Sequence, residues 1–157
     1  MTLARPSFRP DPNRTRDEMV ALQRDLAAAA TFDDDHDCTP ASVAVDMATS
    51  LTNGLPEPEP GAGDVDDPVV VGVDQAFCTD RDDEPDTAVA AAVAMRGGRV
   101  IEYASAVTPV AIPYVPGLLS FREGEPILAA LESLAVAPDL LVCDGSGRIH
   151  YRQAGLA

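Results

Sequence analysis

A helical spacing of apolar residues begins near the amino terminus. Met19 and Leu22 lie three residues apart and open an alanine-rich run, which is the repeat of one helical face. Thr15 and Glu18 stand at the start of this run as a capping box, in which each side chain satisfies a backbone N–H that the first helical turn leaves free. The pattern predicts an amphipathic helix over residues 15–30.

A second helical pattern lies near the carboxyl terminus. Ile127, Leu131 and Leu134 fall on one face at helical spacing. Pro126 precedes them, and we expect it in the first turn, where the missing N–H of a proline is no loss. The pattern predicts a helix over residues 121–135.

Short continuous apolar runs are typical of buried strands. They cover residues 69–73 and 139–143, and two further runs, 87–95 and 100–107, flank the Gly-Gly pair at 97–98. This arrangement predicts a β-hairpin with a primed turn, although the alanines of 87–95 weaken the strand pattern because alanine favours helix. The order helix, strand, hairpin, helix, strand predicts an α/β fold with a mixed sheet.

A loose segment separates the first helix from the first strand. Residues 31–67 are rich in acidic residues, proline and glycine, which is typical of exposed, irregular chain. Within them, residues 42–51 could form a short helix, and the acidic run at 33–38 is interpreted as a solvated surface rather than a metal cluster. We therefore divide the chain into residues 1–67, a helix with an acidic linker, and residues 68–157, an α/β domain.

The charge of the chain changes this picture. The net charge is −15, and all 11 basic residues are arginines. Such a surface repels nucleic acid at low salt. A cytoplasm of high salt would remove the conflict, because molar salt screens charges beyond roughly 3 Å. We therefore expect a salt-adapted protein.

The sequence lacks the features of a membrane span, a secretory signal and a CxxC motif. The sequence contains no apolar run near the ~20 residues of a membrane span, and its first residues have no apolar segment typical of a secretory signal. Cys38, Cys78 and Cys143 are widely spaced and form no CxxC motif. We expect a cytoplasmic protein without membrane contact, with free thiols rather than disulfides or zinc.

Three carboxylates occupy positions where chemistry is expected. Asp74 follows the first buried run, Asp144 follows the last, and Glu123 stands at the entry to the intervening helix. If the two strands are parallel neighbours, their carboxyl ends form the crevice where α/β sheets carry their sites. Crowded carboxylates need a cation, and oxygen ligands select Mg²⁺ or Mn²⁺, which can drive phosphodiester hydrolysis.

Each of these residues also has a structural interpretation. Asp144 with Gly145 is an ordinary turn signal, Asp74 could cap a turn, and Glu123 near a helix start is favoured by the helix dipole. Pattern reasoning alone leaves the structural and catalytic interpretations about equally supported.

The strings around these residues resemble one family. GVDQAF, PYVPGLLSFRE and PDLLVCDGSGRIHYRQAGLA surround Asp74, Glu123 and Asp144, and they resemble endonuclease V over residues 69–157. The resemblance implies a ribonuclease H-like fold and an enzyme that nicks DNA, or in some members RNA, 3′ to a hypoxanthine nucleotide. It also implies that the three carboxylates bind Mg²⁺, with Mn²⁺ as an alternative, and that the complete enzyme is a monomer acting on inosine-containing nucleic acid.

The same resemblance assigns roles around the carboxylates. Tyr114, held between prolines, resembles the family's strand-separating wedge, and a rigid tyrosine can stack on a base without an ordering cost. His150 matches a family histidine near the site. The wedge comprises Pro113, Tyr114, Val115 and Pro116. The lesion pocket comprises Gly117, Leu119, Gly145 and Gly147, where glycines let backbone approach a flipped base.

Some features depart from the family. Residues 75–77, Gln-Ala-Phe, stand where a smaller apolar residue and Ser-Tyr are usual, and Tyr151 replaces a usual proline. The segment 31–67 is longer than usual. The chain stops at Ala157, within a string that in the family leads into a further helix, strand and helix carrying a lysine thought to assist catalysis. We therefore expect an open strand edge at 139–143 and weak or absent cleavage by these 157 residues alone.

Two rival functions remain. One is a nucleic-acid-binding or inert fragment of this fold without turnover, which only an activity assay separates from the enzyme. The other is a different ribonuclease H-like nuclease, such as a resolvase, against which the PYVPG string before Glu123 argues.

Overall fold

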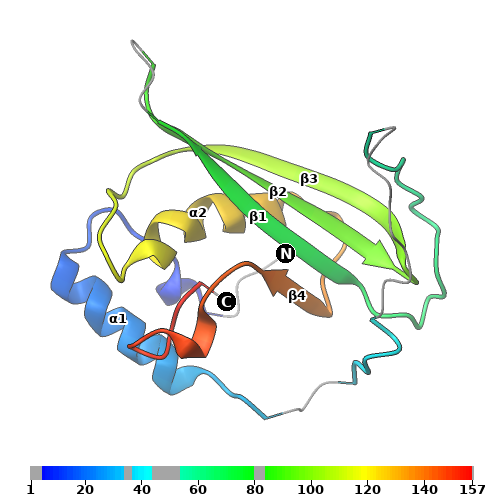
Figure 1. Ribbon diagram of the computed structural model, residues 1–157, viewed down its shortest axis with the longest axis horizontal. Coiled ribbons are helices and arrows are strands. Elements are labelled where there is room, and N and C mark those ends of the chain that lie inside the picture. The colour runs from blue at the N-terminus through cyan, green and yellow to red at the C-terminus, as the bar shows by residue number, and fades with distance from the viewer. Residues whose placement is uncertain (1–4, 34–36, 44–53, 80–83, 157) are drawn as a thin grey trace.

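A four-stranded mixed sheet forms the centre of the computed structural model, which describes residues 5–33, 37–43, 54–79 and 84–156 (Figure 1). Its strands lie in the order β3-β2-β1-β4. They are β1 (Val70–Cys78), β2 (Thr87–Arg96), β3 (Arg99–Pro109) and β4 (Leu140–Cys143). The helices are α1 (Arg16–Ala29) and α2 (Leu119–Glu132), with short 3-10 helices η1 (Pro6–Phe8) and η3 (Gly147–Ile149). This is the mixed α/β fold that the sequence pattern predicts, and it agrees with the ribonuclease H-like fold that the family resemblance implies.

The strand pairing confirms the predicted hairpin and crossover. β2 and β3 pair antiparallel around Gly97 and Gly98, whose φ angles of 54° and 73° are those of a primed turn. β1 pairs antiparallel with β2 and parallel with β4, from Val70 opposite Leu140 to Val73 opposite Cys143. The helix α2 provides the connection that a parallel pair requires.

The main core lies between the sheet and α2. Every second residue of β2 faces this helix, and Ala90, Ala92 and Ala94 are at most 1% exposed. They pack with Ile127 and Leu131 of α2. Small side chains let the helix lie close to the sheet, so tertiary packing overrides the low strand propensity of alanine.

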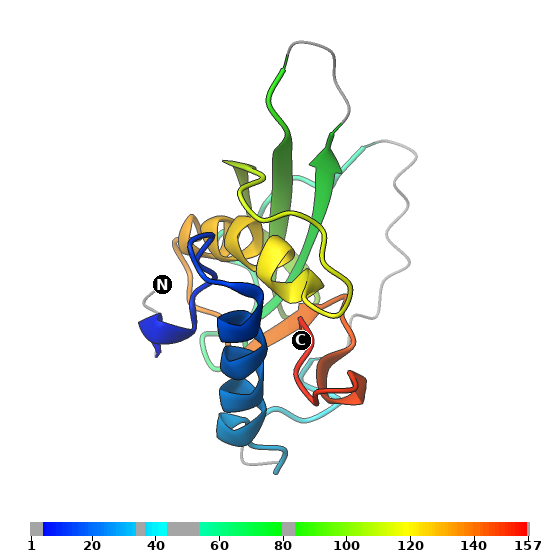
Figure 2. The ribbon, with the colours of Figure 1, turned by 90° about the vertical axis from the view of Figure 1, so that its left-hand side faces the viewer.

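The helix α1 packs away from the sheet. Its capping box between Thr15 and Glu18 is present as predicted. Met19 and Leu22 are buried against the start of α2 and the loop before it, where Leu118 belongs to the same cluster. Figure 2 shows α1 beside α2 rather than on the sheet, so α1 supports the end of the domain where α2 begins.

Two expected boundaries were wrong. Asp74 does not end its strand, because β1 continues to Cys78 while it stays paired with β2. The helix α2 begins at Leu119, so Glu123 lies in its second turn and Pro126 lies inside it rather than in its first turn. The helix tolerates Pro126 there because the ring is buried in the packed face, which offsets the backbone bond that it cannot make.

The acidic linker has no helix or strand in its described parts, 31–33, 37–43 and 54–67. Its last described part, 54–67, follows the start of β3, because the Glu59 N–H donates to the Val100 carbonyl at 2.8 Å and the Tyr103 hydroxyl donates to the Pro56 carbonyl at 2.9 Å. Most of the short helix expected at 42–51, and half of the acidic run at 33–38, lie outside the described residues.

The remaining general expectations concern thiols and membranes. Cys38, Cys78 and Cys143 are all free, as predicted. Among the described helices, none has the length and apolar character needed to cross a bilayer.

Candidate active site at the β1–β4 crevice

The β1–β4 register brings two aspartates together. Val73 and Cys143 form the last parallel pair, Asp74 is the next residue of β1, and Asp144 directly follows the end of β4. Asp139 supports this register, because its carboxylate accepts from the Val69 N–H at 2.8 Å and its own N–H donates to the Val69 carbonyl at 2.9 Å. These two hydrogen bonds fix the pairing at the start of β1 and β4, and the resulting register places Asp74 and Asp144 next to each other at the other end.

Glu123 faces the same crevice from α2. Burial raises the pKa of the Glu123 carboxyl above its usual range, and the negative charges of Asp74 and Asp144 raise it further. The bond from Gln75 and the charge of Arg122 oppose this rise with smaller effects. The three residues predicted from sequence therefore share one electrostatic environment.

Gln75 connects two of these carboxylates. Its backbone N–H donates to Asp74 Oδ1 at 2.8 Å, and its side-chain amide donates to Glu123 Oε1 at 2.8 Å. Its amide oxygen is buried and has no hydrogen-bond partner. Sequence reasoning did not assign Gln75 a role, although its departure from the family's usual apolar residue was a visible signal.

The donor chemistry fits a hard divalent cation. Asp74, Glu123 and Asp144 offer only oxygen ligands, and their like charges favour a cation between them. In the described part of the chain, however, no three His, Cys, Asp or Glu side chains form a ready-made metal cluster. Convergence of the three on a single ion therefore stays a prediction.

A pocket of about 530 Å³ adjoins the carboxylates. This is within the ~300–1,000 Å³ of typical small-molecule sites. Seven of the predicted site residues line it: Tyr114, Gly117, Leu119, Glu123, Asp144, Gly145 and His150. Further lining residues are Gln23, Ser120, Ser146, Tyr151, Gly155 and Leu156. The predicted residues that do not line it are Asp74, Pro113, Val115, Pro116 and Gly147.

Tyr114 projects from a loop that is anchored at both ends. Ile112 and Leu118 on either side are 5% and 1% exposed, whereas Tyr114 is 61% exposed. Gly117 closes the loop with a φ angle of +79°, and the Leu118 N–H donates to the Val115 carbonyl at 2.9 Å. The ring therefore stands at the pocket rim on a backbone that is already ordered.

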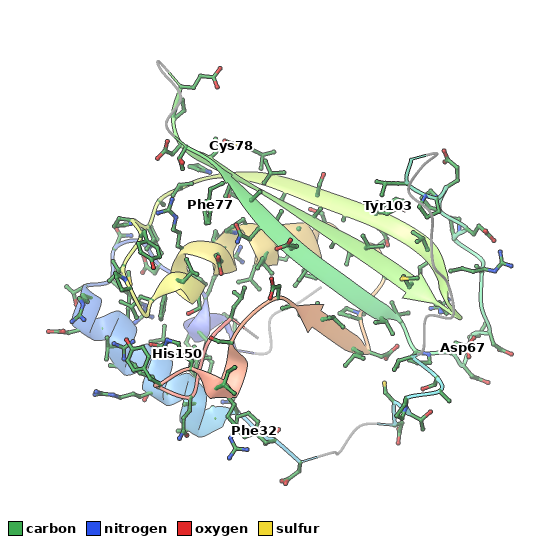
Figure 3. The ribbon with its side chains drawn as sticks, in the orientation of Figure 1. Phe32, Asp67, Phe77, Cys78, Tyr103 and His150 are labelled. Carbon is green, nitrogen blue, oxygen red and sulfur yellow. The ribbon has the colours of Figure 1, made fainter. Side chains whose placement is uncertain are left out.

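His150 lies on the carboxyl-terminal segment that forms another wall of the pocket (Figure 3). Its Nδ1 accepts from the Arg152 N–H at 3.2 Å, and the Gln23 amide nitrogen lies 3.5 Å from the same atom. Because Nδ1 is the acceptor, the neutral ring carries its proton on Nε2. Tyr151 stacks on His150 with ring centroids 4.4 Å apart. Sequence reasoning missed the contributions of Gln23 and Arg152, which bond to each other across 129 positions of the chain.

Comparison with known proteins gives a consistent result. The family model described as Endonuclease V matches residues 41–157. Endonuclease V of Halobacterium salinarum is 54% identical over 165 residues, which covers 100% of this chain and 57% of that protein. Endonuclease V of Natronomonas pharaonis is 50% identical and covers 100% of this chain and 53% of that protein. The chain thus spans about half the length of these relatives.

Solved structures agree with the fold. Endonuclease V from Streptomyces avermitilis superposes with a TM-score of 0.59 and 38% identity over 95% of this chain and 54% of that chain. Endonuclease V from Bacillus subtilis gives a TM-score of 0.67 at 21% identity, over 93% of this chain and 51% of that chain, and it supports the fold alone.

Proposed function

Since the chain belongs to the endonuclease V family, we propose that it acts as a metal-dependent endonuclease that nicks nucleic acid 3′ to hypoxanthine. The observation that carries this proposal is the shared location of three carboxylates and a pocket with an exposed tyrosine at its rim. The carboxylates suit phosphodiester hydrolysis, and the pocket suits a base removed from its stack. The role is initiation of repair of deaminated adenine in a salt-rich cytoplasm.

The carboxylates would hold the metal. Asp74, Glu123 and Asp144 supply the oxygen ligands that Mg²⁺ prefers, and Mn²⁺ would serve as an alternative. A divalent cation bound there supplies charge stabilisation for phosphate oxygens and activation of water. Gln75 orients the Glu123 carboxylate by its amide N–H, so this ligand is held close to its working position.

The pocket would select the base. Tyr114 stacks on a base and holds the strand open, and Gly117 and Gly145 let backbone approach the extruded base. The His150 Nδ1 accepts from the Arg152 backbone, so the Nε2–H is available to donate a hydrogen bond to an oxygen of the bound nucleotide. None of these contacts requires a positive protein surface, which suits a chain of net charge −15.

A cleavage assay tests the proposal. Inosine-containing and matched adenine-containing oligonucleotides, as DNA and as RNA, are incubated with the 157-residue chain and Mg²⁺ from low to molar salt. We expect any nicking by this chain to be weak, to fall 3′ to inosine, to require Mg²⁺ and to be strongest at high salt. Preferential binding of inosine strands without cleavage would instead favour a nucleic-acid-binding module, and no preference for inosine would refute the proposal.

A further inference from the structure

Among the described residues, one polar side chain, that of Gln23, is fully buried. Gln23 of α1 is 1% exposed, although glutamine is usually a surface residue. Its amide nitrogen donates to the Ala154 carbonyl, and its amide oxygen accepts from Arg152 Nη1 at 3.0 Å. Both ends of the buried amide therefore contact the carboxyl-terminal segment, about 130 residues away in the chain.

Arg152 extends this contact to the loop that carries Tyr114. The same Nη1 atom donates to the Gly117 carbonyl at 2.9 Å. The Arg152 backbone N–H donates to His150 Nδ1 at 3.2 Å, so Arg152 also orients the imidazole. One guanidinium thus connects α1, the loop at 113–117 and the segment at 150–155.

The fit between the two pocket walls is close. Gly117 has a φ angle of +79°, and a Cβ added there would lie 2.0 Å from the Tyr151 hydroxyl oxygen. The Arg152 guanidinium lies 4.3 Å from the centre of the Tyr151 ring. A small movement of the loop away from Arg152 would therefore change the space between Tyr114 and the opposite wall.

We propose that Gln23 and Arg152 are positioning residues that hold the two walls of the pocket at a fixed separation and so set its preference for hypoxanthine. The assignment of the base to this pocket rests on the proposed function. The amide of Gln23 and the Nη1 atom of Arg152 are bonded to other parts of the chain, so their effect on a base is exerted through the Gly117 loop and the His150 ring. α1 is then part of the recognition site and not only a support for α2.

The test measures the mobility of the two pocket walls and the preference for hypoxanthine in separate experiments. Arg152→Met and Gln23→Met remove the bonds while keeping an unbranched side chain. Hydrogen exchange of peptides covering 113–118 and 150–156, measured without nucleic acid, should become faster in both variants. Binding of inosine-containing relative to adenine-containing single strands should lose about tenfold in discrimination, and the double variant should lose little more because both act through one connection.

Two further variants keep the outcome decisive. Arg9→Met removes a guanidinium that connects the amino-terminal segment to α2 outside the pocket, so it should leave the discrimination unchanged. Gln23→Glu keeps the acceptor for Arg152 and loses the donor to Ala154, so it should restore part of the discrimination. If Arg152→Met does not fold, Arg152→Gln, which lacks the guanidinium, serves the same comparison.

Three outcomes decide between the ideas. Unchanged exchange at 113–118 in the folded Arg152 variants would show that the connection does not hold the loop. Faster exchange with unchanged discrimination would make the connection purely structural. Absence of any inosine preference in the unaltered chain would refute the proposed function instead, while the exchange data would still decide whether Gln23 and Arg152 hold the walls together.

Discussion

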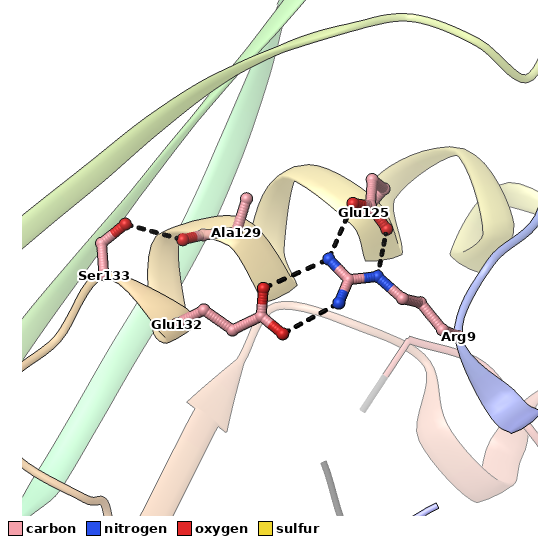
Figure 4. A network of polar contacts seen from close by, with 5 residues as sticks. All are labelled: Arg9, Glu125, Ala129, Glu132 and Ser133. Atoms are coloured by element: carbon pink, nitrogen blue, oxygen red, sulfur yellow. Dashed lines mark hydrogen bonds and ion pairs between the residues drawn. The ribbon is translucent and has the colours of Figure 1, made fainter. Parts of the chain in front are cut away.

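The helix α2 carries carboxylates in two different situations. Glu125 and Glu132 both bind Arg9, which donates to Glu125 at 2.8 and 2.9 Å and to Glu132 at 2.8 and 3.2 Å (Figure 4). Glu123 lies only two residues before Glu125, yet it faces Asp74 and Asp144. The helix therefore carries two carboxylates that share one arginine, Glu125 and Glu132, and one carboxylate of an unneutralised group, Glu123 with Asp74 and Asp144.

The pKa directions express this difference. The two glutamates raise the pKa of Arg9 through hydrogen bonds, as expected for an ion pair that favours its charged form. Burial and then neighbouring aspartates raise the pKa of Glu123, which disfavours its charged form. Glu125 and Glu132, which connect α2 to the amino-terminal segment, pair with Arg9. Glu123 lies instead at the crevice beside carboxylates of like charge, which disfavour its charged form. Such an arrangement is typical of functional sites.

Exchanging one glutamate from each group should produce the largest difference. Glu123→Gln keeps an acceptor for the Gln75 amide but removes a proposed metal ligand, so Mg²⁺-dependent cleavage should fall by about 10²-fold or more. Glu125→Gln is the matched control on the same helix and should leave cleavage within about twofold, because surface ion pairs contribute little. Initial rates on inosine DNA measure both. Equal losses in the two variants would contradict the functional distinction.

Mg²⁺ bound at Asp74, Glu123 and Asp144 should stabilise the folded chain, and Glu125 and Glu132 should take no part in this effect. Mg²⁺ at about 100 times its Kd should add about 2.7 kcal/mol to the free energy of unfolding, or about 5–10 °C in Tm. Thermal melting with and without Mg²⁺, at constant ionic strength, measures this. The shift should shrink in Asp144→Asn and persist in Glu125→Gln. A shift of the same size in Asp144→Asn would place the metal elsewhere.

Replacing Tyr114 should weaken the binding of inosine strands and leave Mg²⁺ binding unchanged. Tyr114→Ala should weaken binding of inosine strands by ~1–3 kcal/mol, the contribution of one stacked base. Its Mg²⁺-dependent Tm shift should stay unchanged, because the ring carries no metal ligand. Tyr103→Ala serves as the control, since this tyrosine contacts the linker through Pro56 and lies outside the pocket. Unchanged discrimination between inosine and normal strands in Tyr114→Ala would remove the wedge role.

Repulsion among Glu123, Asp74 and Asp144 should lower the free energy of unfolding when no metal is bound. Glu123→Gln in metal-free buffer at pH 7 should be more stable than the unaltered chain by about a few tenths of a kcal/mol, a small value because the carboxylate is partly exposed and screened. Because the folded-state pKa of Glu123 is raised, its contribution to stability is present below the unfolded value of 4.5 and is lost as pH rises through the folded value. The advantage of the variant should therefore disappear as pH falls toward 4.5. Denaturant unfolding across this pH range provides the check, and an advantage that grows on acidification would be the contrary result.

Salt should act on the two groups in opposite directions. Molar KCl screens the repulsion around Glu123 and across a chain of net charge −15, and it also weakens the Arg9 ion pairs. Repulsion involves more charges, so Tm should rise by a few degrees in the unaltered chain, and by more in Arg9→Met relative to its own low-salt value. A Tm that does not rise between low and molar KCl would count against salt adaptation.

The elements that local sequence determines were predicted well. The capping box at Thr15 and the primed turn at Gly97 and Gly98 depend on residues a few positions apart, so their patterns can be read directly. The apolar runs that became β1 and β4 indicated buried strands for the same reason. The three carboxylates were proposed because the sequence places each next to an apolar run or at an expected helix entry, and the family strings around them gave their proposed roles.

Other features depended on partners far along the chain. β1 continues past Asp74 because β2 pairs with it, and the alanines of β2 form a strand because α2 covers them. The bond between Gln75 and Glu123 joins residues 48 positions apart, and the bond between Arg152 and Gln23 joins residues 129 positions apart. A side-chain amide or guanidinium can serve many partners, and only the folded backbone decides which acceptor lies within reach. The sequence thus determined the elements and the candidate chemistry of this protein, while the tertiary structure decided which of its carboxylates pair with an arginine and which side chains connect the two walls of its pocket.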